Sequence, residues 1–389
     1  NTQLLSGKFN PSTGTKVDFK RPHDYNSIRS AGGDISGADK SDIIAGKATG
    51  TVQPYFTSAT EWSNIQEALE LDQLDQILEP MARRLVTDLE LDLAKFMRIN
   101  TGLNYGARGT AVDAWSDVAG AGAMMDSVGV PMSDNKYYLM NPFTTTSLAS
   151  AQSGLNAADG LVRTAFEKAQ IASNFGGMKA LTSNALSSYT SGTTTDRLGD
   201  LKTAPDATYV TAKDTMQQTM VIETLGTGTI EAGDQIQIAG VNRLNIATRQ
   251  LILDATGAAV PWTGTVLSVV TIAGNEATVV VSGAAIFEAN GQYNNVDAAP
   301  AAGAVVTILG AAGAVYQPNL FYTEQAFGLG TVKLPKLYST DTVATTSDGM
   351  SIRVSKYSDG DANTQKIRFD LLPAYACFNP NFAGQGYGV

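Results

Sequence analysis

The residues best suited to acid–base or nucleophilic chemistry are scarce in this sequence. Its 389 residues include one histidine, His23, and one cysteine, Cys377. His23 lies in the charged stretch KRPHDYNS, which is typical of an exposed arm, whereas general acid–base catalysis needs an imidazole held by a partner. Cys377 lies in the apolar run LLPAYACF and is expected to be a small buried hydrophobic residue. One cysteine excludes an intrachain disulfide and a cysteine-based zinc site.

Carboxylate pairs are the remaining candidates for hydrolytic chemistry. The acidic residues that fall along one predicted helical stretch are Glu67, Glu70, Asp72, Asp75 and Glu79. A helix face with this many charges is usually solvated. The loops GTGTIEAG and SDGDANTQ lack a P-loop lysine and the full calcium-ligand spacing, respectively, and are interpreted as turns. We therefore predict a protein that is not an enzyme and has no cofactor or metal, with a carboxylate-dependent hydrolase as the less favoured alternative.

Net charge and hydropathy limit the binding partners. A net charge of −10 argues against base-specific nucleic-acid binding, because neutralising phosphates needs clustered lysine and arginine. Hydrophobic residues make up 43% of the chain, which is enough to fill the cores of more than one domain. No run of about 18 apolar residues could span a bilayer, and NTQLLSGKFNPSTG lacks the features of a signal peptide. We expect a soluble protein, made in the cytoplasm, with no membrane partner.

Charges of both signs are concentrated in residues 16–47, and this pattern suits contacts between subunits. The candidates in this region are Lys20, Arg21, Arg29, Asp34, Lys40 and Lys47. The alternative is a solvated loop, where exposed charge pairs contribute little. A second set of candidates lies on the polar face of a predicted long helix and consists of Arg83, Arg84, Glu90 and Asp92.

A two-stranded arm is predicted to carry the first set. Residues 16–20 and 49–56 are strand-like, and the connection between them is rich in Gly, Ser and Asp without apolar periodicity. Such an arm buries too little surface to be stable on its own. The arm therefore needs further contacts to be stable.

Helices are predicted next along the chain. Helical periodicity starts at Glu61 with Trp62, Ile65 and Leu69. Pro80 suits a first helical position, and the pattern then continues up to Gly102, a length of about 30 Å.

Helix and strand then alternate from residue 111 to about residue 187. Residues 115–128 and 160–169 are predicted helices, and residues 136–140 a short buried strand. The stretch SSYTSGTTTDRLGD that follows has the composition of a linker.

A nearly all-β block is predicted from residue 203 to residue 316. Its predicted strands are YVTA, TMVIETL, DQIQIAG, GTVLSVVTI, EATVVVSG and AVVTILG. Short strands separated by Gly, Asn and Asp turns indicate a small antiparallel barrel or sandwich. Because the flanking parts have the pattern of one interrupted domain, we predict an insertion that folds by itself.

The C-terminal stretch NLFYTEQAFGLGTVKLPKL, followed by GMSIRVSKYSDGDANTQKIRFDLLPAYACFNPNFAG, alternates apolar and polar residues around turns. Together with TKVDFKRPHDYNSIR, GGDISG, IIAGKATG, RLVTDLELDLAKFM and LVRTAFEKAQIASNFGG, it resembles the major capsid proteins of tailed bacteriophages. The resemblance covers most of the chain outside a central block. It implies an α+β architecture, the Hong Kong phage-like capsid fold, with an extended loop, a peripheral domain with a long spine helix, and an α/β axial domain. The two-stranded arm resembles this extended loop, which implies that it lies across a neighbouring subunit, which would supply the missing burial. The chain also resembles the subset from short-tailed phages that carries an immunoglobulin-like or telokin-like insertion.

The resemblance also implies a division of the chain. The expected parts are the remnant of an N-terminal arm (1–15), the extended loop (16–60), the peripheral domain with the spine helix (61–110), the first part of the axial domain (111–202), the inserted β domain (203–316), the axial return (317–345) and the C-terminal strands of the peripheral domain (346–389). Because the resembling proteins have a helical arm before the extended loop, an upstream segment is expected to be absent or removed.

The function implied by the resemblance is structural. Copies of the chain would form pentamers and hexamers and close an icosahedral shell around packaged double-stranded DNA. A scaffolding protein and a portal would be partners, and assembly in the host bacterial cytoplasm would place the protein in the virion. A lysine–asparagine crosslink, for which Lys40, Lys47 and Asn379 would be candidates, is not expected. The alternative is a β-rich tail component or surface adhesin, which would lack the helix-rich middle.

Overall fold

The computed structural model describes residues 3–5, 14–63, 74–154, 168–169, 171–345 and 349–389. Several predictions lie outside these ranges. They concern Ile65 and Leu69, the acidic residues Glu67, Glu70 and Asp72, and most of the predicted helix 160–169.

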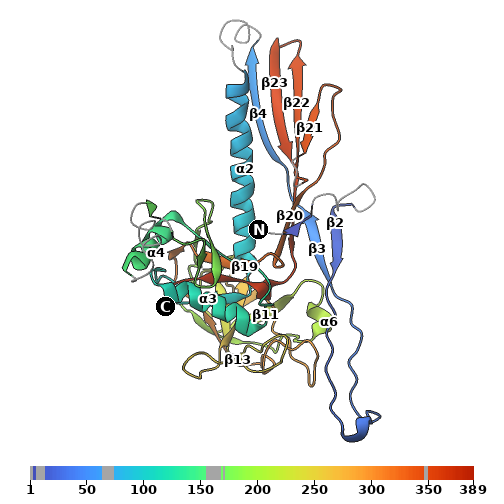
Figure 1. Cartoon of the computed structure of the whole chain (residues 1–389), viewed down its shortest axis with the longest axis vertical. Coiled ribbons are helices and arrows are strands. Elements are labelled where there is room, and N and C mark those ends of the chain that lie inside the picture. Colours follow the sequence, from blue (N-terminus) through green and yellow to red (C-terminus); the bar gives the residue numbers. More distant parts are fainter. Residues whose placement is uncertain (1–2, 6–13, 64–73, 155–167, 170, 346–348) are drawn as a thin grey trace.

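A long helix packed against a long sheet forms the peripheral part of the molecule (Figure 1). The helix is α2 (Leu74–Ile99). The antiparallel sheet consists, in order, of β21 (Thr342–Thr345), β22 (Ser351–Asp359), β23 (Thr364–Leu371) and β4 (Phe56–Ser63). Leu85 and Leu89 lie on one face of α2 because they are four positions apart, and they are buried against Phe369 and Leu371 of β23.

Two predictions about this region are wrong. Glu61 and Trp62 are not helical but lie in β4, where outward and inward side chains alternate and Trp62 is buried. Pro80 does not begin a helix but lies inside α2. Leu78 and Met81 continue the apolar face on both sides of Pro80, and packing against the sheet offsets the hydrogen bond that proline cannot make.

The axial part is a six-stranded sheet covered by helices. The strands are, in order, β5 (Leu103–Tyr105), β25 (Ala383–Gly386), β19 (Asn319–Thr323), β6 (Lys136–Met140), β8 (Met178–Thr182) and β7 (Asn174–Phe175). The helices are α3 (Trp115–Val128) and α4 (Pro142–Gly154). The predicted helix 115–128 and the predicted strand 136–140 are confirmed. α3 buries Val118 and Met125 against the sheet and ends at Gly129, whose φ of 103° suits glycine.

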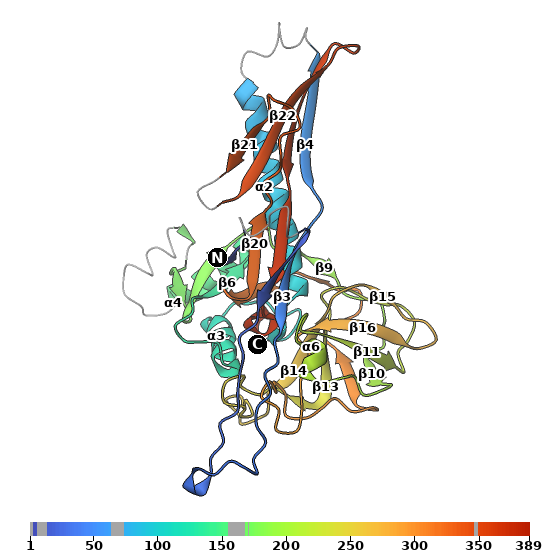
Figure 2. The same cartoon turned by 90° about the vertical axis from the view of Figure 1, so that its right-hand side faces the viewer.

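A third sheet joins the two parts and carries the extended loop. Its strands are, in order, β1 (Gln3–Leu4), β20 (Phe327–Thr331), β24 (Pro373–Cys377), β3 (Lys47–Val52) and β2 (Lys16–Lys20). The extended loop is predicted as residues 16–60. Its projecting part, residues 21–46 between β2 and β3, is hereafter called the extended loop, and it points away from the body in the direction opposite to α2 (Figure 2). One turn of 3-10 helix, η1 (Ala31–Gly33), lies at its tip.

The predicted assignment of residues 346–389 to the peripheral domain is wrong in part, because β24 lies in the joining sheet and β25 in the axial sheet. Gly384 of β25 lies opposite Phe321 of β19 in the axial sheet. A side chain at Gly384 would meet the ring of Phe321 at 2.2 Å, so a glycine is needed where the two strands pack.

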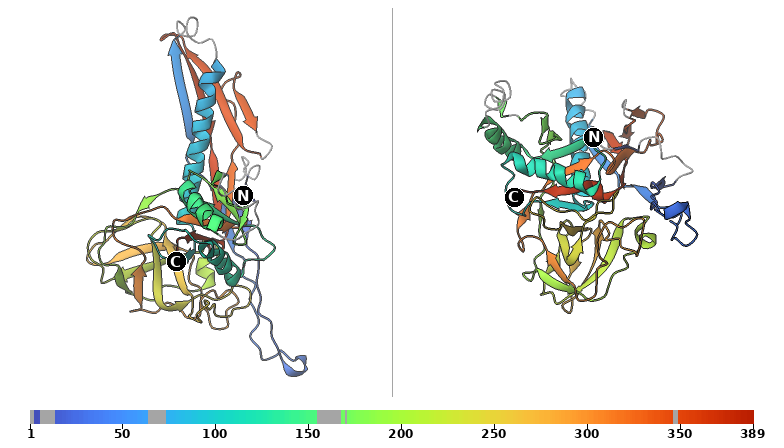
Figure 3. Two further views of the ribbon diagram at one scale, coloured as in Figure 1. Left: turned by 60° about the vertical axis from the view of Figure 1, so that its left-hand side comes forward. Right: turned by 60° about the horizontal axis from the view of Figure 1, so that its bottom comes forward.

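The inserted block is a closed barrel. Its strands are, in order, β10 (Leu198–Leu201), β11 (Gln217–Glu223), β16 (Ala277–Ser282), β14 (Pro261–Val266), β13 (Gln235–Asn242) and β17 (Val305–Ile308). The predicted all-β character is confirmed, and Trp262 and Ile236 lie in its core. Of the two predicted shapes, the structure shows the barrel, and the immunoglobulin-like description is not confirmed. The barrel lies beside the axial domain, away from the distal end of α2 (Figure 3).

Two details of the predicted insertion are wrong. β10 comes before residue 203 and overlaps the end of the stretch predicted as a linker, and it pairs with both β11 and β17. YVTA is not a strand but the short helix α6 (Tyr209–Ala212). Asp206 accepts hydrogen bonds from the Thr208 N–H and the Thr211 hydroxyl, which favours a helical turn over a strand.

Candidate subunit-contact surface

The tip of the extended loop, residues 27–41, is exposed. Arg29, Asp34 and Lys40 of the predicted contact set all lie there. Asp34 accepts a hydrogen bond of 2.9 Å from the Ser36 N–H, and this bond lowers the pKa of its carboxyl group. The carboxyl group therefore stays charged at neutral pH and is available to a partner.

Apolar side chains are exposed on the same loop. Ile28, Ile35 and Ile43 have 39%, 42% and 80% of their surface exposed. Exposed isoleucines interspersed with charges on one projecting segment are typical of a surface that another protein covers.

The other predicted contact residues of this region lie at the base of the loop. Arg21 is half-buried and bonds to its own chain, since Nε donates to the Lys47 carbonyl at 3.1 Å and the guanidinium also donates to the Phe378 carbonyl. Lys47 forms an exposed ion pair of 2.8 Å with Asp18 across β2 and β3. Lys20 is exposed at the end of β2. The candidates at the tip therefore lie apart from Arg21 and Lys47 at the base, which are bonded within the chain.

The charged residues of α2 are also largely paired within the chain. Two exposed ion pairs, Arg83–Glu79 and Arg84–Asp88, have one-turn spacing and lengths of 2.5 and 2.9 Å. Asp92 accepts a hydrogen bond of 3.0 Å from the Tyr375 hydroxyl, and burial together with this carboxylate raises the pKa of Tyr375.

Glu90 is the fourth candidate of this set and is exposed on α2. The helix and the extended loop point in opposite directions, so the two predicted sets lie on separate surfaces (Figure 1).

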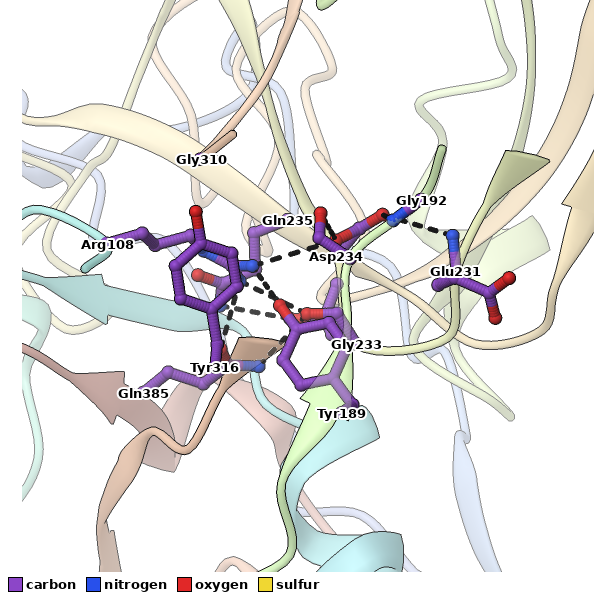
Figure 4. A network of polar contacts seen from close by, with 12 residues as sticks. Arg108, Tyr189, Gly192, Glu231, Gly233, Asp234, Gln235, Gly310, Tyr316 and Gln385 are labelled. Carbon is purple, nitrogen blue, oxygen red and sulfur yellow. Dashed lines mark hydrogen bonds and ion pairs between the residues drawn. The ribbon is translucent and has the colours of Figure 1, made fainter. Parts of the chain in front are cut away.

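A buried polar network, which the sequence reasoning missed, lies where the barrel meets the axial domain (Figure 4). Arg108 follows β5 and donates to the Gly233 carbonyl at 3.1 Å and to Gln385 Oε1 at 2.9 Å. Its guanidinium also lies within 5.8 Å of the ring centres of Tyr189, Tyr316 and Tyr387. A cation among three aromatic rings in a buried site is held in one position by both types of contact.

Asp234 holds the barrel side of the same network. It accepts hydrogen bonds from the Ser191 hydroxyl at 2.7 Å and from the Gly192 and Glu231 N–H groups at 2.9 and 3.0 Å. Ser191 and Gly192 follow β9 (Tyr189–Thr190), which pairs with β18 (Val315–Tyr316) where the chain enters and leaves the barrel. The network therefore fixes the entry to the barrel against the axial sheet.

Two further arginines extend this contact. Arg98, near the end of α2, donates to the Ala232 carbonyl at 3.1 Å and lies 4.1 Å from the ring centre of Tyr189. Arg243, which follows β13 in the barrel, is 1% exposed and donates to the carbonyl groups of Thr263 and Gly102. The barrel is thus joined to the axial domain by buried, hydrogen-bonded side chains of Arg98, Arg108 and Arg243.

The residues considered first for chemistry do not form a catalytic site in the described part of the chain. His23 is exposed and stacks on Tyr25 with ring centres 6.4 Å apart. The Cys377 thiol donates to the Asn100 carbonyl at 3.7 Å, and burial raises its pKa to about 12. Within the described ranges, no group of three or more His, Cys, Asp or Glu residues could hold a metal ion.

No described helix has the length and apolar character needed to cross a membrane.

The comparisons with known proteins identify the family. The family model for the P22 coat protein, gene protein 5, matches residues 1–388. The chain belongs to the P22 coat protein family. A curated major capsid protein of Acyrthosiphon pisum secondary endosymbiont phage 1 is 48% identical over 391 residues, which cover 99% of this chain and 92% of that protein. The chain is therefore a phage major capsid protein, as the sequence predicted, and the adhesin and hydrolase alternatives are set aside.

Solved structures of phage capsids are also similar to this coat protein. The capsid of cyanophage P-SCSP1u matches with 13% identity and a TM-score of 0.49, covering 100% of this chain and 86% of that chain. A structure from Mycobacterium phage Che8 matches with 11% identity and a TM-score of 0.49, covering 99% and 88%. The family assignment rests on the family model and the curated relative.

Proposed function

We propose that this coat protein assembles into an icosahedral shell of pentamers and hexamers around packaged double-stranded DNA. Besides family membership, one observation carries the proposal. The extended loop projects from the body and exposes both charged and apolar side chains at its tip. A neighbouring subunit would bury these side chains, and symmetry would repeat the contact throughout the shell.

The parts of the chain take different roles in this proposal. The axial domain would gather around the symmetry axes, while the extended loop and the peripheral sheet would join neighbouring subunits. Each contact can be weak, because a closed shell repeats it many times.

The remaining partners follow from the family resemblance. A scaffolding protein and a portal would take part in assembly in the host bacterial cytoplasm, and the finished shell would enclose DNA without reading its sequence. The net charge of −10 fits this role, because a wall that bound the genome tightly would hinder packaging and release.

Imaging of purified protein tests the proposal. We expect closed shells by negative-stain electron microscopy, and we expect Arg29→Glu or Asp34→Lys to reduce shell yield without lowering the melting temperature of the free subunit. The control is Lys202→Glu, which changes an exposed charge of the barrel that pairs with Glu276. Failure of the wild-type protein to form shells, with or without a scaffolding protein, would contradict the proposed function. Equal shell yields for the tip variants and the wild type would contradict the role of the tip.

A further inference from the structure

The base of the extended loop is held by the barrel of its own chain. We propose that Arg249 and Tyr293 are positioning residues that set the direction of the extended loop before subunits meet. The inference rests on the proposed assembly function and adds a task for the barrel within it. The contacts on the two limbs of the loop, residues 21–26 and 42–46, carry the argument.

The first limb is bound through Asp24. The Arg249 guanidinium forms an ion pair with the Asp24 carboxylate, and the same side chain donates to the Asn294 carbonyl at 2.9 Å. The Asp24 N–H lies 3.4 Å from the Tyr293 hydroxyl, and the Asn26 side chain donates to the Asn290 carbonyl at 2.7 Å. The ion pair is partly shielded from water, since the Arg249 side chain is 19% exposed and that of Asp24 45%.

The second limb is bound by the same barrel segment. The Gln292 side chain donates to the Asp42 carbonyl at 2.6 Å, and the Tyr293 hydroxyl donates to the Ile44 carbonyl at 3.5 Å. The Ile44 side chain packs on a small apolar cluster that includes Tyr209, whose ring stacks on Tyr293 with centres 3.6 Å apart. Tyr293 therefore contacts both limbs and is itself fixed by stacking.

Two of the barrel residues in these contacts have an unusual backbone conformation. Arg249 has a φ of 58° and Asn290 a φ of 57°, in the left-handed region that side-chain-bearing residues seldom adopt. Asparagine tolerates this conformation, whereas an arginine there is strained. Strain of this kind persists where the surrounding contacts maintain it and is concentrated at functional positions.

The contacts form a point of attachment rather than a continuous core. A cavity of about 630 Å³ lies under the base of the loop, between the barrel and the axial domain, and Arg21, Asp24 and Arg249 are among the residues that line it. The limbs are therefore fixed mainly by the hydrogen bonds and the ion pair. Fixing the base while the tip stays exposed reduces the conformational freedom that would otherwise be lost when a neighbour binds.

Hydrogen exchange of free subunits tests the inference with two variants. Arg249→Gly removes the side chain but suits the φ of 58°, so the barrel turn should be retained. Asp24→Asn removes the charge from the other partner. We expect exchange in both limbs to become about tenfold faster in each variant, because a charge-assisted hydrogen bond is lost. Exchange in β11 and β16 should not change. The control is Lys202→Gln, which removes a barrel ion pair with Glu276 that does not involve the loop.

Unchanged exchange in both limbs for both variants would overturn the inference. A second measurement is the rate of shell formation, which should be lower for Arg249→Gly than for Lys202→Gln, whereas a higher rate would contradict pre-orientation. If wild-type subunits formed no shells, the proposed function would fail, but the exchange of free subunits would still show whether the barrel holds the loop.

Discussion

Arg108 and Asp234 lie 3.8 Å apart, with side chains 1% and 0% exposed, and they belong to different parts of the molecule. Arg108 follows the axial strand β5, and Asp234 precedes the barrel strand β13. Burying two charges costs about as much as their attraction returns, so the pair adds little net stability by itself. Its consequence is specific placement, because Arg108 reaches both Asp234 and the Gly233 carbonyl only when the barrel is correctly placed against the axial domain.

Removal of one partner from this pair should be severe. We expect Arg108→Ala to lower the free energy of unfolding by about 3–5 kcal/mol, because Asp234 would remain buried without its cation. Urea denaturation of the free subunit measures the change. The control is Arg83→Ala, which breaks an exposed ion pair of α2 and should cost at most about 1 kcal/mol. Equal losses for the two variants would show that the buried network does not determine the seating of the barrel.

The sequence predicted elements whose pattern is local. The short buried run in residues 136–140 and the helical pattern of residues 115–128 identify a strand and a helix without reference to any partner. The contact between the barrel and the axial domain has no such local pattern. Asp234 lies in the turn of GTGTIEAGD, and Arg108 lies in a loop whose sequence has no helical or strand periodicity. Their pairing therefore depends on tertiary structure and not on a local pattern.

The barrel should fold alone when its first strand is included. We expect a fragment of residues 187–316 to unfold cooperatively on heating, because it contains β10 and can close the barrel. A fragment of residues 203–316 lacks β10 and leaves β11 and β17 without a shared neighbour, so it should melt at a lower temperature or stay unfolded. Circular dichroism measures the melting temperatures of the two fragments. Equal melting temperatures would support the predicted domain boundary at residue 203.

The charged residues show a second limit of sequence reasoning. Charge patterning selected both Arg29 and Arg21, yet Arg29 is exposed at the tip and Arg21 bonds to backbone carbonyls of its own chain. Asp92 was also selected by charge patterning, yet it is bonded within its own chain. Its partner is Tyr375, which is far away in the sequence. A pattern of charges shows that polar partners are needed, but folding decides whether they belong to the same chain.

Asp370 should make the peripheral sheet sensitive to acid. Burial raises the pKa of this carboxyl group, but hydrogen bonds from Arg353 and Arg368, each 2.6 Å long, outweigh burial and lower it below the ordinary value of 3.8. A pKa lowered in the folded state stabilises the protein fully above pH 3.8, and this contribution is lost as the pH falls through the folded-state pKa.

The matched variant is Asp370→Asn. We expect it to be less stable than the wild type at pH 7 by about 3 kcal/mol, because the cation of Arg353 is left buried and unpaired. The difference should shrink as the pH falls below 3.8, where the wild-type carboxylate also loses its charge. Thermal denaturation of both proteins from pH 7 to acidic pH would measure this difference in stability. A difference that does not change with pH would contradict the role assigned to the Asp370 carboxylate.

The tip of the extended loop and the strands β2 and β3 that carry the loop should respond differently to assembly. In free subunits, amides of residues 27–41 should exchange rapidly, because in the described part of the chain this exposed segment forms its hydrogen bonds within the loop. Amides of β2 and β3 should already be protected by their antiparallel pairing. Assembly into shells should slow exchange at the tip by burying it against a neighbour, with little change in β2 and β3. Hydrogen-exchange mass spectrometry of free subunits and shells makes the comparison, and equal exchange at the tip in both states would show that the exposed isoleucines and charges do not contact another subunit.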